Sequence, residues 1–220
     1  MAVPALNAAS VDCAGLANNH VLDYEEVALR DTLNEPDEAG VAHSGAGRTL
    51  DEALEPAVVS IGGVTVAVVA FTDNTPEFEA RGESSGTARI EVDTGDDRAL
   101  ELTDEALTRA REHDPDLIVA SFHWGPNMIE EPPESFREFG RWLVDRGVDT
   151  VHGHSAHVFQ GVEIHDGAPI IYDAGDFVDA YAVDDDRRND RSFVFEVRIE
   201  PESGDPVELR STPLRSRTAK

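Results

Sequence analysis

Apolar runs and segments of helical periodicity follow one another in the second half of the chain. Residues 99–113 and 133–146 carry apolar side chains at near-helical spacing, and each segment precedes an apolar run, Leu117–Phe122 and Val148–Val151 respectively. A repeated order of helix and buried strand favours parallel strands that are covered by helices. The pattern therefore predicts an α/β fold.

A β-hairpin is predicted in the first half of the chain. Ala57–Ile61 and Val64–Phe71 are β-rich runs, and Gly62 and Gly63 separate them. Two glycines supply the positive φ that both central positions of a tight hairpin turn require. Further strands are expected over 12–17, 41–43, 158–164, 169–172, 192–199 and 207–209.

Two polar features interrupt these elements. Asp23, with Glu26 three residues later, has the spacing of a capping box and predicts the start of a helix. Residues 74–97 are polar and contain several glycine and serine residues, so we expect an exposed excursion there.

The domain organisation is expected to be simple. A chain of 220 residues fits one domain with a single core, and neither an internal repeat nor a long linker divides it. We therefore expect one domain over residues 1–200, followed by a terminal strand and a polar tail over residues 201–220.

The charge is strongly negative. Forty-five Asp and Glu residues face 18 Lys and Arg residues, for a formal net charge of −27, and the acids are spread along the whole chain. This pattern fits either a cationic partner or, as we prefer, a surface adapted to high salt, where screening relieves self-repulsion. It argues against nucleic-acid binding, which needs a basic surface.

The hydropathy pattern predicts no transmembrane segment. The longest apolar run, Val64–Phe71, is too short to cross a bilayer, and Met1–Ser10 lacks the basic start and apolar stretch of a signal peptide. We therefore expect a cytoplasmic location. The single cysteine, Cys13, lies in an apolar stretch and is interpreted as a core thiol rather than a nucleophile.

Three polar clusters directly follow apolar strands. They are Asn19 with His20, then His123, and then His154 with His157. Ligands of open α/β sheets bind beyond the carboxyl ends of the strands, and imidazole and amide groups are metal ligands. The clusters therefore predict one shared metal or phosphate site at that edge.

Each cluster also has a structural interpretation. The segment 18–20 could be a helix-capping turn, and His123 could be a packed loop histidine. The segment Gly153–His157 is the strongest of the three, because two histidines leave one loop after a glycine that lets the backbone turn. His43, His113 and His165 lack such a context, whereas His152 directly precedes Gly153; all four are left out of the predicted site.

An ordered set of motifs resembles one family. The motifs are Leu16-Ala17-Asn18-Asn19-His20 with Leu22-Asp23-Tyr24, His123-Trp124-Gly125, Gly153-His154-Ser155-Ala156-His157-Val158-Phe159-Gln160, and Tyr172-Asp173-Ala174-Gly175-Asp176-Phe177. They resemble the CapA family of capsule-biosynthesis proteins, which is associated with poly-γ-glutamate synthesis and is similar to calcineurin-like metallophosphoesterases. The resemblance implies a layered α-β-β-α sandwich. Where the family's last motif ends in Leu-Gly-Asn-Phe, this chain has Asp176 in place of the Asn.

The resemblance also implies roles for the clustered residues. Asn19, His123, His154 and His157 match metal ligands, and His20 matches the histidine that contacts the scissile phosphate and protonates the leaving group. The implied cofactor is a divalent ion, namely Mn, Fe, Zn or Mg, and the implied chemistry is metal-assisted hydrolysis of a phosphate-containing or polyanionic substrate.

One part of the family pattern has no counterpart. Family members begin with a strand that carries a metal-binding Asp and a following segment with a further acid, and nothing before Asp12 supplies either. We therefore expect an N-terminally shortened member that lacks the first strand–helix unit and holds one divalent ion rather than two. The carboxylates that could assist are those of Asp12, Asp23, Glu163, Asp173 and Asp176.

Three functions remain open at this point. The first is a metal-dependent phosphoesterase-like hydrolase of capsule or poly-γ-glutamate biosynthesis. The second is a non-catalytic assembly or polymer-handling protein that keeps only the fold. The third is an acidic globular protein whose histidines are structural. The sequence does not indicate an oligomeric state.

Overall fold

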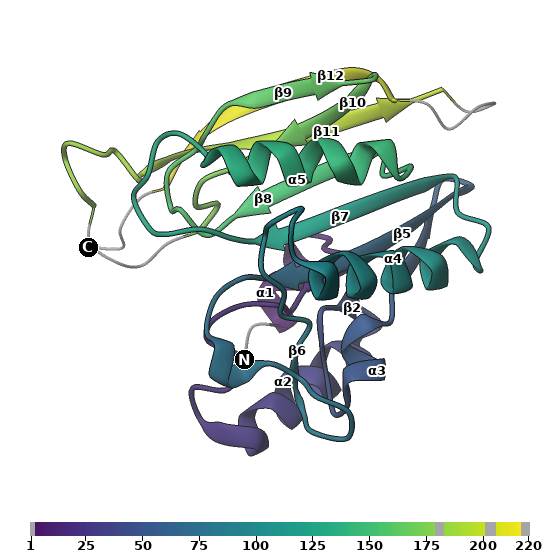
Figure 1. The fold of residues 1–220 in the computed structure, drawn as a ribbon. Helices are drawn as coiled ribbons and strands as arrows, with labels where there is room; N and C mark the ends of the chain where they lie inside the picture. The colour runs from purple at the N-terminus through teal and green to yellow at the C-terminus, as the bar shows by residue number, and fades with distance from the viewer. Residues whose placement is uncertain (1–2, 179–182, 201–205, 217–220) are drawn as a thin grey trace. The chain divides into compact units, whose positions relative to one another are not determined.

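A computed structural model describes residues 3–178, 183–200 and 206–216, and they form two compact units. The first unit comprises Met1–Glu91 and Gly95–His123, and the second comprises Val92–Thr94 and Trp124–Lys220. Each unit combines helices with a small mixed sheet (Figure 1), so the predicted α/β class is confirmed. Residues 201–205, directly after the predicted domain boundary at residue 200, and residues 217–220 of the predicted polar tail lie outside the described residues. The boundary at residue 200 therefore stays a prediction.

The first unit contains the predicted hairpin. Strand β4 (Ala57–Ile61) pairs antiparallel with β5 (Val64–Thr72), and the connecting Gly62 and Gly63 have φ values of 62° and 91°. Both values lie in the left-handed region, where a side chain is disfavoured. The local sequence therefore determines this turn.

A helical crossover joins β5 to a parallel neighbour. Strand β7 (Leu117–His123) pairs parallel with β5 and places Thr72 opposite His123. Helix α4 (Asp97–Arg111) precedes β7, and the Asp96 side chain caps it by accepting a hydrogen bond from the Ala99 amide. The apolar face of α4 is buried through Ala99, Leu102, Ala106, Leu107 and Ala110.

The remainder of the first unit surrounds a second small sheet. Strand β1 (Cys13–Gly15) pairs parallel with β2 (Ala42–Ser44), and Leu29 and Leu33 of α2 are buried in the core beside them. The other elements are α1 (Val3–Ala8), α2 (Glu25–Ala39), β3 (Ala46–Gly47), α3 (Leu50–Leu54), the 3-10 turn η1 (Pro76–Phe78) and β6 (Gly86–Thr87).

The predicted capping box at Asp23 is wrong. Helix α2 begins at Glu25, its N-cap is Tyr24, and no side chain caps it. The Asp23 carboxylate instead contacts the ring of His20 at 2.7 Å. A local contact with His20 thus takes the carboxylate that the spacing assigned to the helix.

The expectation of an exposed excursion over residues 74–97 is also wrong in part. Ala80, Thr87 and Ala88 are at most 1% exposed. The Ile90 amide donates to the Thr72 carbonyl, and the Ala88 amide donates to the Gly45 carbonyl. The composition of the segment suggested exposure because it has few large apolar side chains. Its backbone hydrogen bonds nevertheless attach it to the sheet region of the first unit.

The second unit is built around β8 (Thr150–His154), β10 (Ala168–Ile171) and β9 (Val162–His165). Strand β10 pairs parallel with β8 and antiparallel with β9. Strand β8 extends to His154, beyond the predicted end at Val151, so His154 terminates a strand instead of lying in the following loop. The strand predicted from residue 158 begins only at Val162.

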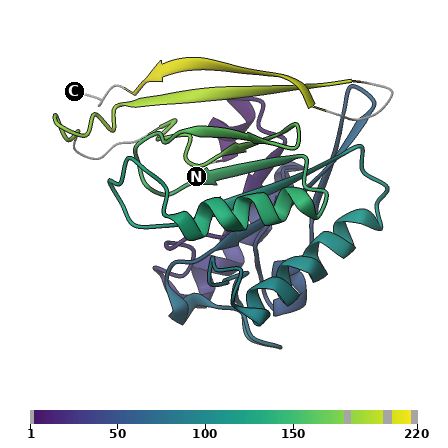
Figure 2. The same ribbon diagram turned by 45° about the horizontal axis from the view of Figure 1, so that its top comes forward.

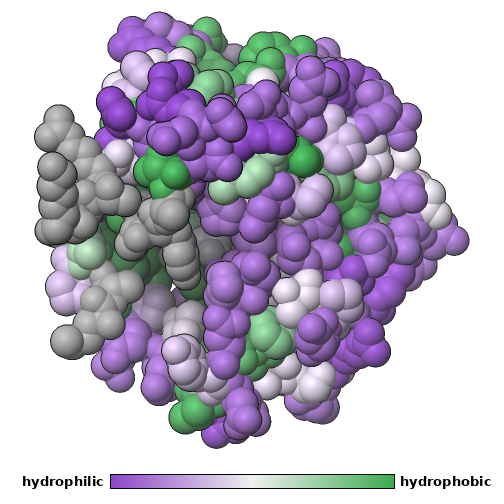
Figure 3. Space-filling model, turned by 90° about the vertical axis from the view of Figure 1, so that its left-hand side faces the viewer, coloured by the Kyte–Doolittle hydropathy of each residue, from purple (hydrophilic) through white to green (hydrophobic). Residues whose placement is uncertain are grey.

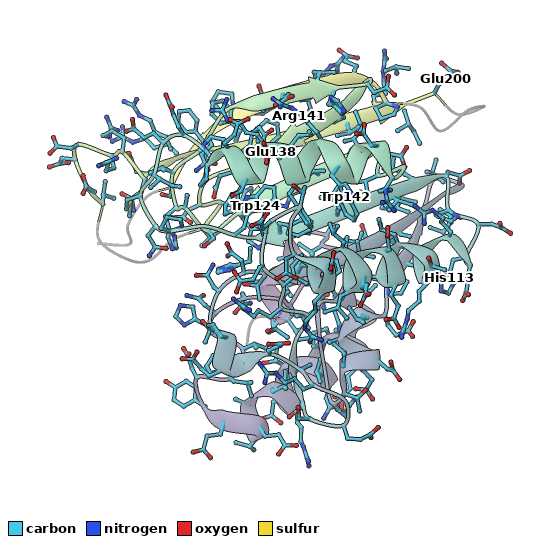
Figure 4. The ribbon with its side chains drawn as sticks, viewed as in Figure 1. His113, Trp124, Glu138, Arg141, Trp142 and Glu200 are labelled. Atoms are coloured by element: carbon cyan, nitrogen blue, oxygen red, sulfur yellow. The ribbon has the colours of Figure 1, made fainter. Side chains whose placement is uncertain are left out.

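Helix α5 (Glu134–Asp145) packs on this sheet through an apolar face that includes Phe136, Phe139 and Leu143. A Cβ atom on Gly140 would lie 3.1 Å from a methyl carbon of Ile170, so the glycine allows close packing of helix on strand. Trp124, which is labelled in Figure 4, stacks on Phe136 with ring centroids 4.9 Å apart.

A long antiparallel ribbon completes the second unit. Strand β11 (Arg191–Ile199) pairs with β12 (Pro206–Arg215), and the two run side by side (Figure 2). The strand predicted over residues 207–209 is therefore much longer than its apolar residues suggested. Cross-strand hydrogen bonding extends it through the polar segment that follows.

The visible surface is dominated by hydrophilic residues. The face in Figure 3 shows hydrophobic residues only as small separate patches. Within residues 3–178, 183–200 and 206–216, no helix combines the length and the apolar character that crossing a membrane requires.

Candidate functional site

His123 ends strand β7 in a defined hydrogen-bonding environment. Its side chain is largely buried, and its Nδ1 lies 3.1 Å from the Thr72 hydroxyl oxygen. The same hydroxyl donates to the His123 carbonyl at 3.0 Å. Both the side chain and the backbone of His123 are thus in contact with the end of the neighbouring strand.

The sequence interpretation missed the neighbours of His123. Thr72 ends β5, the strand parallel to β7, and Asp73 and Asn74 directly follow it. The Asn74 amide group donates to the Asp73 carboxylate at 2.8 Å and lies 3.4 Å from His123 Nδ1. The available signal was a polar triplet directly after the apolar run Val64–Phe71, the same pattern that indicated the other clusters.

The segment with Asn19 and His20 lies in an exposed turn of the first unit. Asn18 accepts the His20 amide at 2.8 Å, which forms a local turn. His20 Nδ1 contacts the Asp23 carboxylate at 2.7 Å, and 68% of the His20 side chain is exposed. Asn19 is half-buried, and its side chain forms no hydrogen bond with the part of the chain that the structure describes.

The segment 154–157 of the second unit, here called the histidine loop, has a strained backbone. Ser155 and His157 have φ values of 117° and 61°, a region that non-glycine residues rarely adopt. Between them, Ala156 is 1% exposed and is held at both backbone groups. Its amide donates to Asp173 at 2.7 Å, and its carbonyl accepts from the Met128 amide at 2.8 Å. Strain of this kind persists only where the surroundings hold it, and it is concentrated at functional sites.

Gly153 before this loop is required for close packing. A Cβ atom there would overlap the carbonyl oxygen of Tyr172 and lie 2.5 Å from the indole nitrogen of Trp124. The expectation that this glycine serves a backbone turn is wrong, because it lies within β8 and its φ is not positive. The indole nitrogen of Trp124 donates to the same Tyr172 carbonyl at 2.8 Å, which attaches Trp124 to the residue directly after β10.

Asp173 is the buried anchor of the histidine loop. It is 1% exposed and accepts the amides of Ala156 and Gly175, each at 2.7 Å. Burial raises the pKa of its carboxyl to about 7, although the two backbone hydrogen bonds act in the opposite direction.

Asp176 fixes the ring of His157. Its two carboxylate oxygens lie 2.9 and 3.2 Å from His157 Nδ1. An ionised carboxylate only accepts, so Nδ1 carries the proton and Nε2 carries the lone pair. A carboxylate on the second ring nitrogen is the usual support of a metal-binding histidine. Asp176, which replaces the family's Asn, thus contacts a predicted ligand.

The other carboxylates and histidines have structural partners. Glu163 on β9 accepts from Arg141 of α5, labelled in Figure 4, and from Tyr172, and these hydrogen bonds lower its pKa. His165 contacts Asp145 at 2.8 Å, and His43 contacts Asp37 at 3.1 Å. These contacts agree with leaving both histidines out of the predicted site.

His152 and Cys13 also take structural positions. Burial lowers the pKa of His152, whose ring centroid lies 5.5 Å from that of His154. Burial raises the pKa of the Cys13 thiol to about 11, so the thiol stays protonated at neutral pH and is not an activated nucleophile.

The predicted ligands are divided between the two units. Asn19, His20 and His123 belong to the first, whereas His154 and His157 belong to the second. Among the described residues, no group of three or more His, Cys, Asp or Glu side chains has an arrangement that could hold a metal. The shared site and its metal ligands therefore stay predictions, although the tautomer of His157 fits such a role.

Comparison with known proteins relates most of the chain to one family. The family model described as bacterial capsule synthesis protein PGA_cap matches residues 1–181. A probable polyglutamine synthesis accessory protein of Mycobacterium tuberculosis is 34% identical over 224 residues, which cover 97% of this chain and 58% of that protein. The PGA biosynthesis protein CapA of Bacillus subtilis is 30% identical over 164 residues, which cover 74% of this chain and 41% of that protein. The chain thus spans less than two thirds of the length of these relatives.

A solved structure supports the fold alone. The crystal structure of a hypothetical protein from Thermus thermophilus matches with a TM-score of 0.56 and 14% sequence identity. The match covers 96% of this chain and 79% of that chain.

Proposed function

Because the chain belongs to the PGA_cap family of bacterial capsule synthesis proteins, we propose that it acts in poly-γ-glutamate capsule biosynthesis through a metallophosphoesterase-like site that binds one divalent metal ion. The names of the mycobacterial and Bacillus relatives support the biosynthetic role. The cytoplasmic location expected from the sequence stays a prediction.

The observation that carries the proposal is the pairing of His157 with Asp176 in the strained histidine loop. The Asp176 carboxylate lies 2.9 Å from His157 Nδ1 and fixes the ring, and Asp173 holds the loop by accepting the Ala156 amide. A purely structural surface histidine needs neither a strained φ nor a buried anchor. Both features are expected where a ring nitrogen must be held in one position.

The residues take separate roles in this proposal. His154 and His157 hold the ion by ring nitrogens, and His123 and Asn19 are the further ligands that the sequence predicts. The amide oxygen of Asn19 is the harder ligand of the set. When bound, a divalent ion neutralises phosphate charge and polarises the bond that breaks. Three imidazoles and one amide bring no negative charge, which is why one ion is proposed rather than two.

His20 would act on the leaving group. Its ring is exposed, and the Asp23 carboxylate orients it through Nδ1 at 2.7 Å, so Nε2 is the nitrogen that would exchange a proton with substrate. The substrate class is a phosphate-containing or polyanionic molecule.

Metal content is the direct test. The protein is loaded with Mn²⁺ or Zn²⁺, desalted, and analysed for metal per chain; about one ion is expected. His157→Ala should remove it, and Asp176→Ala should weaken binding about 10- to 100-fold. His165→Ala is the matched control, because that ring also pairs with a carboxylate but lies on β9. A parent protein that retains no metal contradicts the proposal.

Turnover separates the catalytic from the non-catalytic alternative. Hydrolysis of a generic phosphodiester with added Mn²⁺ should be slow but abolished by His157→Ala and His20→Ala. Stoichiometric metal without any turnover would instead favour the polymer-handling protein, whose site holds metal for binding only.

A further inference from the structure

A pocket of about 430 Å³ opens beside the histidine loop, within the second unit. Its lining joins the segment directly after His157 to the start of β11, and consists of Glu130, Val158, Phe159, Gln160, Gly161, Asp186, Arg187, Arg188 and Arg191. Three guanidinium groups in one pocket are notable in a chain where acids outnumber bases 45 to 18.

Two of these guanidinium groups are not neutralised by carboxylates. Arg187 donates to the backbone carbonyl of Met128 at 2.9 Å, which positions its side chain without cancelling its charge. Arg191 begins β11 and is exposed. Within the described ranges neither forms an ion pair, although Glu130 and Asp186 also line the pocket.

Arg188 has a different role. It makes a bidentate contact with Asp190 at 2.9 and 3.0 Å, and Arg215 contacts the same carboxylate at 2.6 Å. These contacts lower the pKa of Asp190 to about 2 and fix the chain next to Arg187 and Arg191. The ion pair is thus structural and leaves the two neighbouring arginines to face a ligand.

Phe159 and Gln160 of the lining are held in place by neighbouring residues. Phe159 is 40% exposed and meets Phe193 edge-to-face at 4.9 Å. Gln160 is held by its backbone amide on the Asp173 carbonyl and by its side chain on the Ile129 carbonyl, both at 3.0 Å. An aromatic ring and two cations that line one pocket suit a ligand with methylene groups and a terminal oxyanion.

A second arginine-lined pocket, in the first unit, lacks this property. Its volume is about 510 Å³ and its cations are Arg81, Arg89 and Arg98. Arg81 and Arg98 both pair with the nearly buried Glu79, and Arg89 pairs with Glu91. Each cation there already has a carboxylate.

We infer that the pocket next to the histidine loop binds an oxyanion carried on a flexible aliphatic chain, and that the guanidinium groups of Arg187 and Arg191 bind this oxyanion. The oxyanion is either a carboxylate of a glutamyl polymer or a phosphoryl group. This inference rests on the proposed function, since it names the substrate group that would lie beside the proposed metal site. Val158, which lines the pocket, directly follows His157 in the chain.

The test measures binding by calorimetry with penta-γ-glutamate and, separately, with inorganic phosphate. EDTA is present, so the result does not depend on metal, and about 0.5 M KCl screens the general repulsion of a −27 chain. Arg187→Gln and Arg191→Gln should each weaken binding about tenfold, and the double variant more. Arg30→Gln is the control, since Arg30 pairs with Glu26 on α2 of the other unit.

The outcomes separate the alternatives. Binding of the peptide alone identifies a carboxylate polymer, and binding of phosphate alone identifies a phosphoryl group; both support the inference. Equal affinity of parent and double variant, or no binding of either probe to the parent, overturns it. Arg187→Lys keeps the charge but loses the planar guanidinium group that can donate two parallel hydrogen bonds, so this variant should bind the probe more weakly than the parent. It tests the inference even if the double variant is unstable.

His157→Ala distinguishes failure of this inference from failure of the proposed function. The variant should lose metal yet keep its affinity for the probe in EDTA. Metal binding without probe binding would contradict only the pocket, and probe binding without metal would contradict only the metal site.

Discussion

The two histidine-bearing turns of the molecule are held in opposite ways. In the first unit, His20 is 68% exposed, and its partners, Asn18 and Asp23, lie two and three residues away. In the second unit, His157 is held by Asp176, nineteen residues away, and its loop by Asp173, seventeen residues from Ala156. One turn is a local structure on the surface, and the other depends on tertiary packing.

The difference extends to the backbone of the two turns. Positive φ at Ser155 and His157 costs on the order of 1–3 kcal/mol per residue, and the fold retains it only because Asp173 and Met128 hold Ala156 from both sides. The turn at His20 has normal φ values and needs no such support. Variants of the supporting carboxylates should therefore have very unequal effects.

The largest effect is expected from pH, through Asp173. Its pKa is about 7 in the folded protein and 3.8 in the reference state, so the folded state holds the proton more tightly between these values. The stability that this group contributes is complete below pH 4 and is lost as pH rises through 7, by a few kcal/mol. Urea unfolding at pH 4.5, 6 and 8 measures it. Asp173→Asn should flatten this part of the pH profile, and an unchanged profile would contradict the assignment.

Asp173→Asn should itself destabilise the protein by about 2 kcal/mol at pH 5, because an amide offers one acceptor where the carboxyl group serves two backbone amides. Chemical unfolding gives the difference. Asp145→Asn is the control, since that carboxylate is exposed and pairs with a surface histidine, and its change should stay below about 0.5 kcal/mol. Equal losses in the two variants would mean that the histidine loop has no special anchor.

Salt should act on the whole molecule rather than on either turn. Forty-five acids against 18 bases imply self-repulsion that ions screen, so the midpoint of thermal unfolding should rise by several degrees from dilute to molar KCl. The destabilisation by Asp173→Asn should persist in molar KCl, because buried contacts are screened little. Equal midpoints in the two buffers would show that the acidic surface is not an adaptation to salt.

The smallest effect is expected from Asp23→Ala. The pair with His20 is exposed, so its loss should cost less than about 0.5 kcal/mol of stability and leave metal affinity unchanged. Asp176→Ala, by contrast, should lower metal affinity at least tenfold. Phosphodiester turnover is the further measurement, and a decrease with Asp23→Ala alone would support the proposed role of His20. A loss of metal in both variants would remove the contrast between the turns.

Local patterns were sufficient for much of the architecture and for the family. The hairpin at Gly62 and Gly63, the helices α4 and α5 and the β7 strand follow from short-range periodicity and turn chemistry, which act within a few residues. The ordered histidine motifs indicated the CapA family, and the comparison with known proteins confirmed it.

Only the tertiary structure decided which carboxylates support which histidines. Asp23, Asp173 and Asp176 were equivalent candidates in the sequence, since each is an acid near a motif. Burial and pairing separated them: Asp173 accepts two backbone amides in the core, Asp176 orients His157, and Asp23 remains at the surface with His20. Likewise, Gly153 is required because the Tyr172 carbonyl approaches it, a contact between residues nineteen positions apart. Periodicity reports which face of an element is apolar, but a hydrogen bond between distant residues depends on how the whole chain packs.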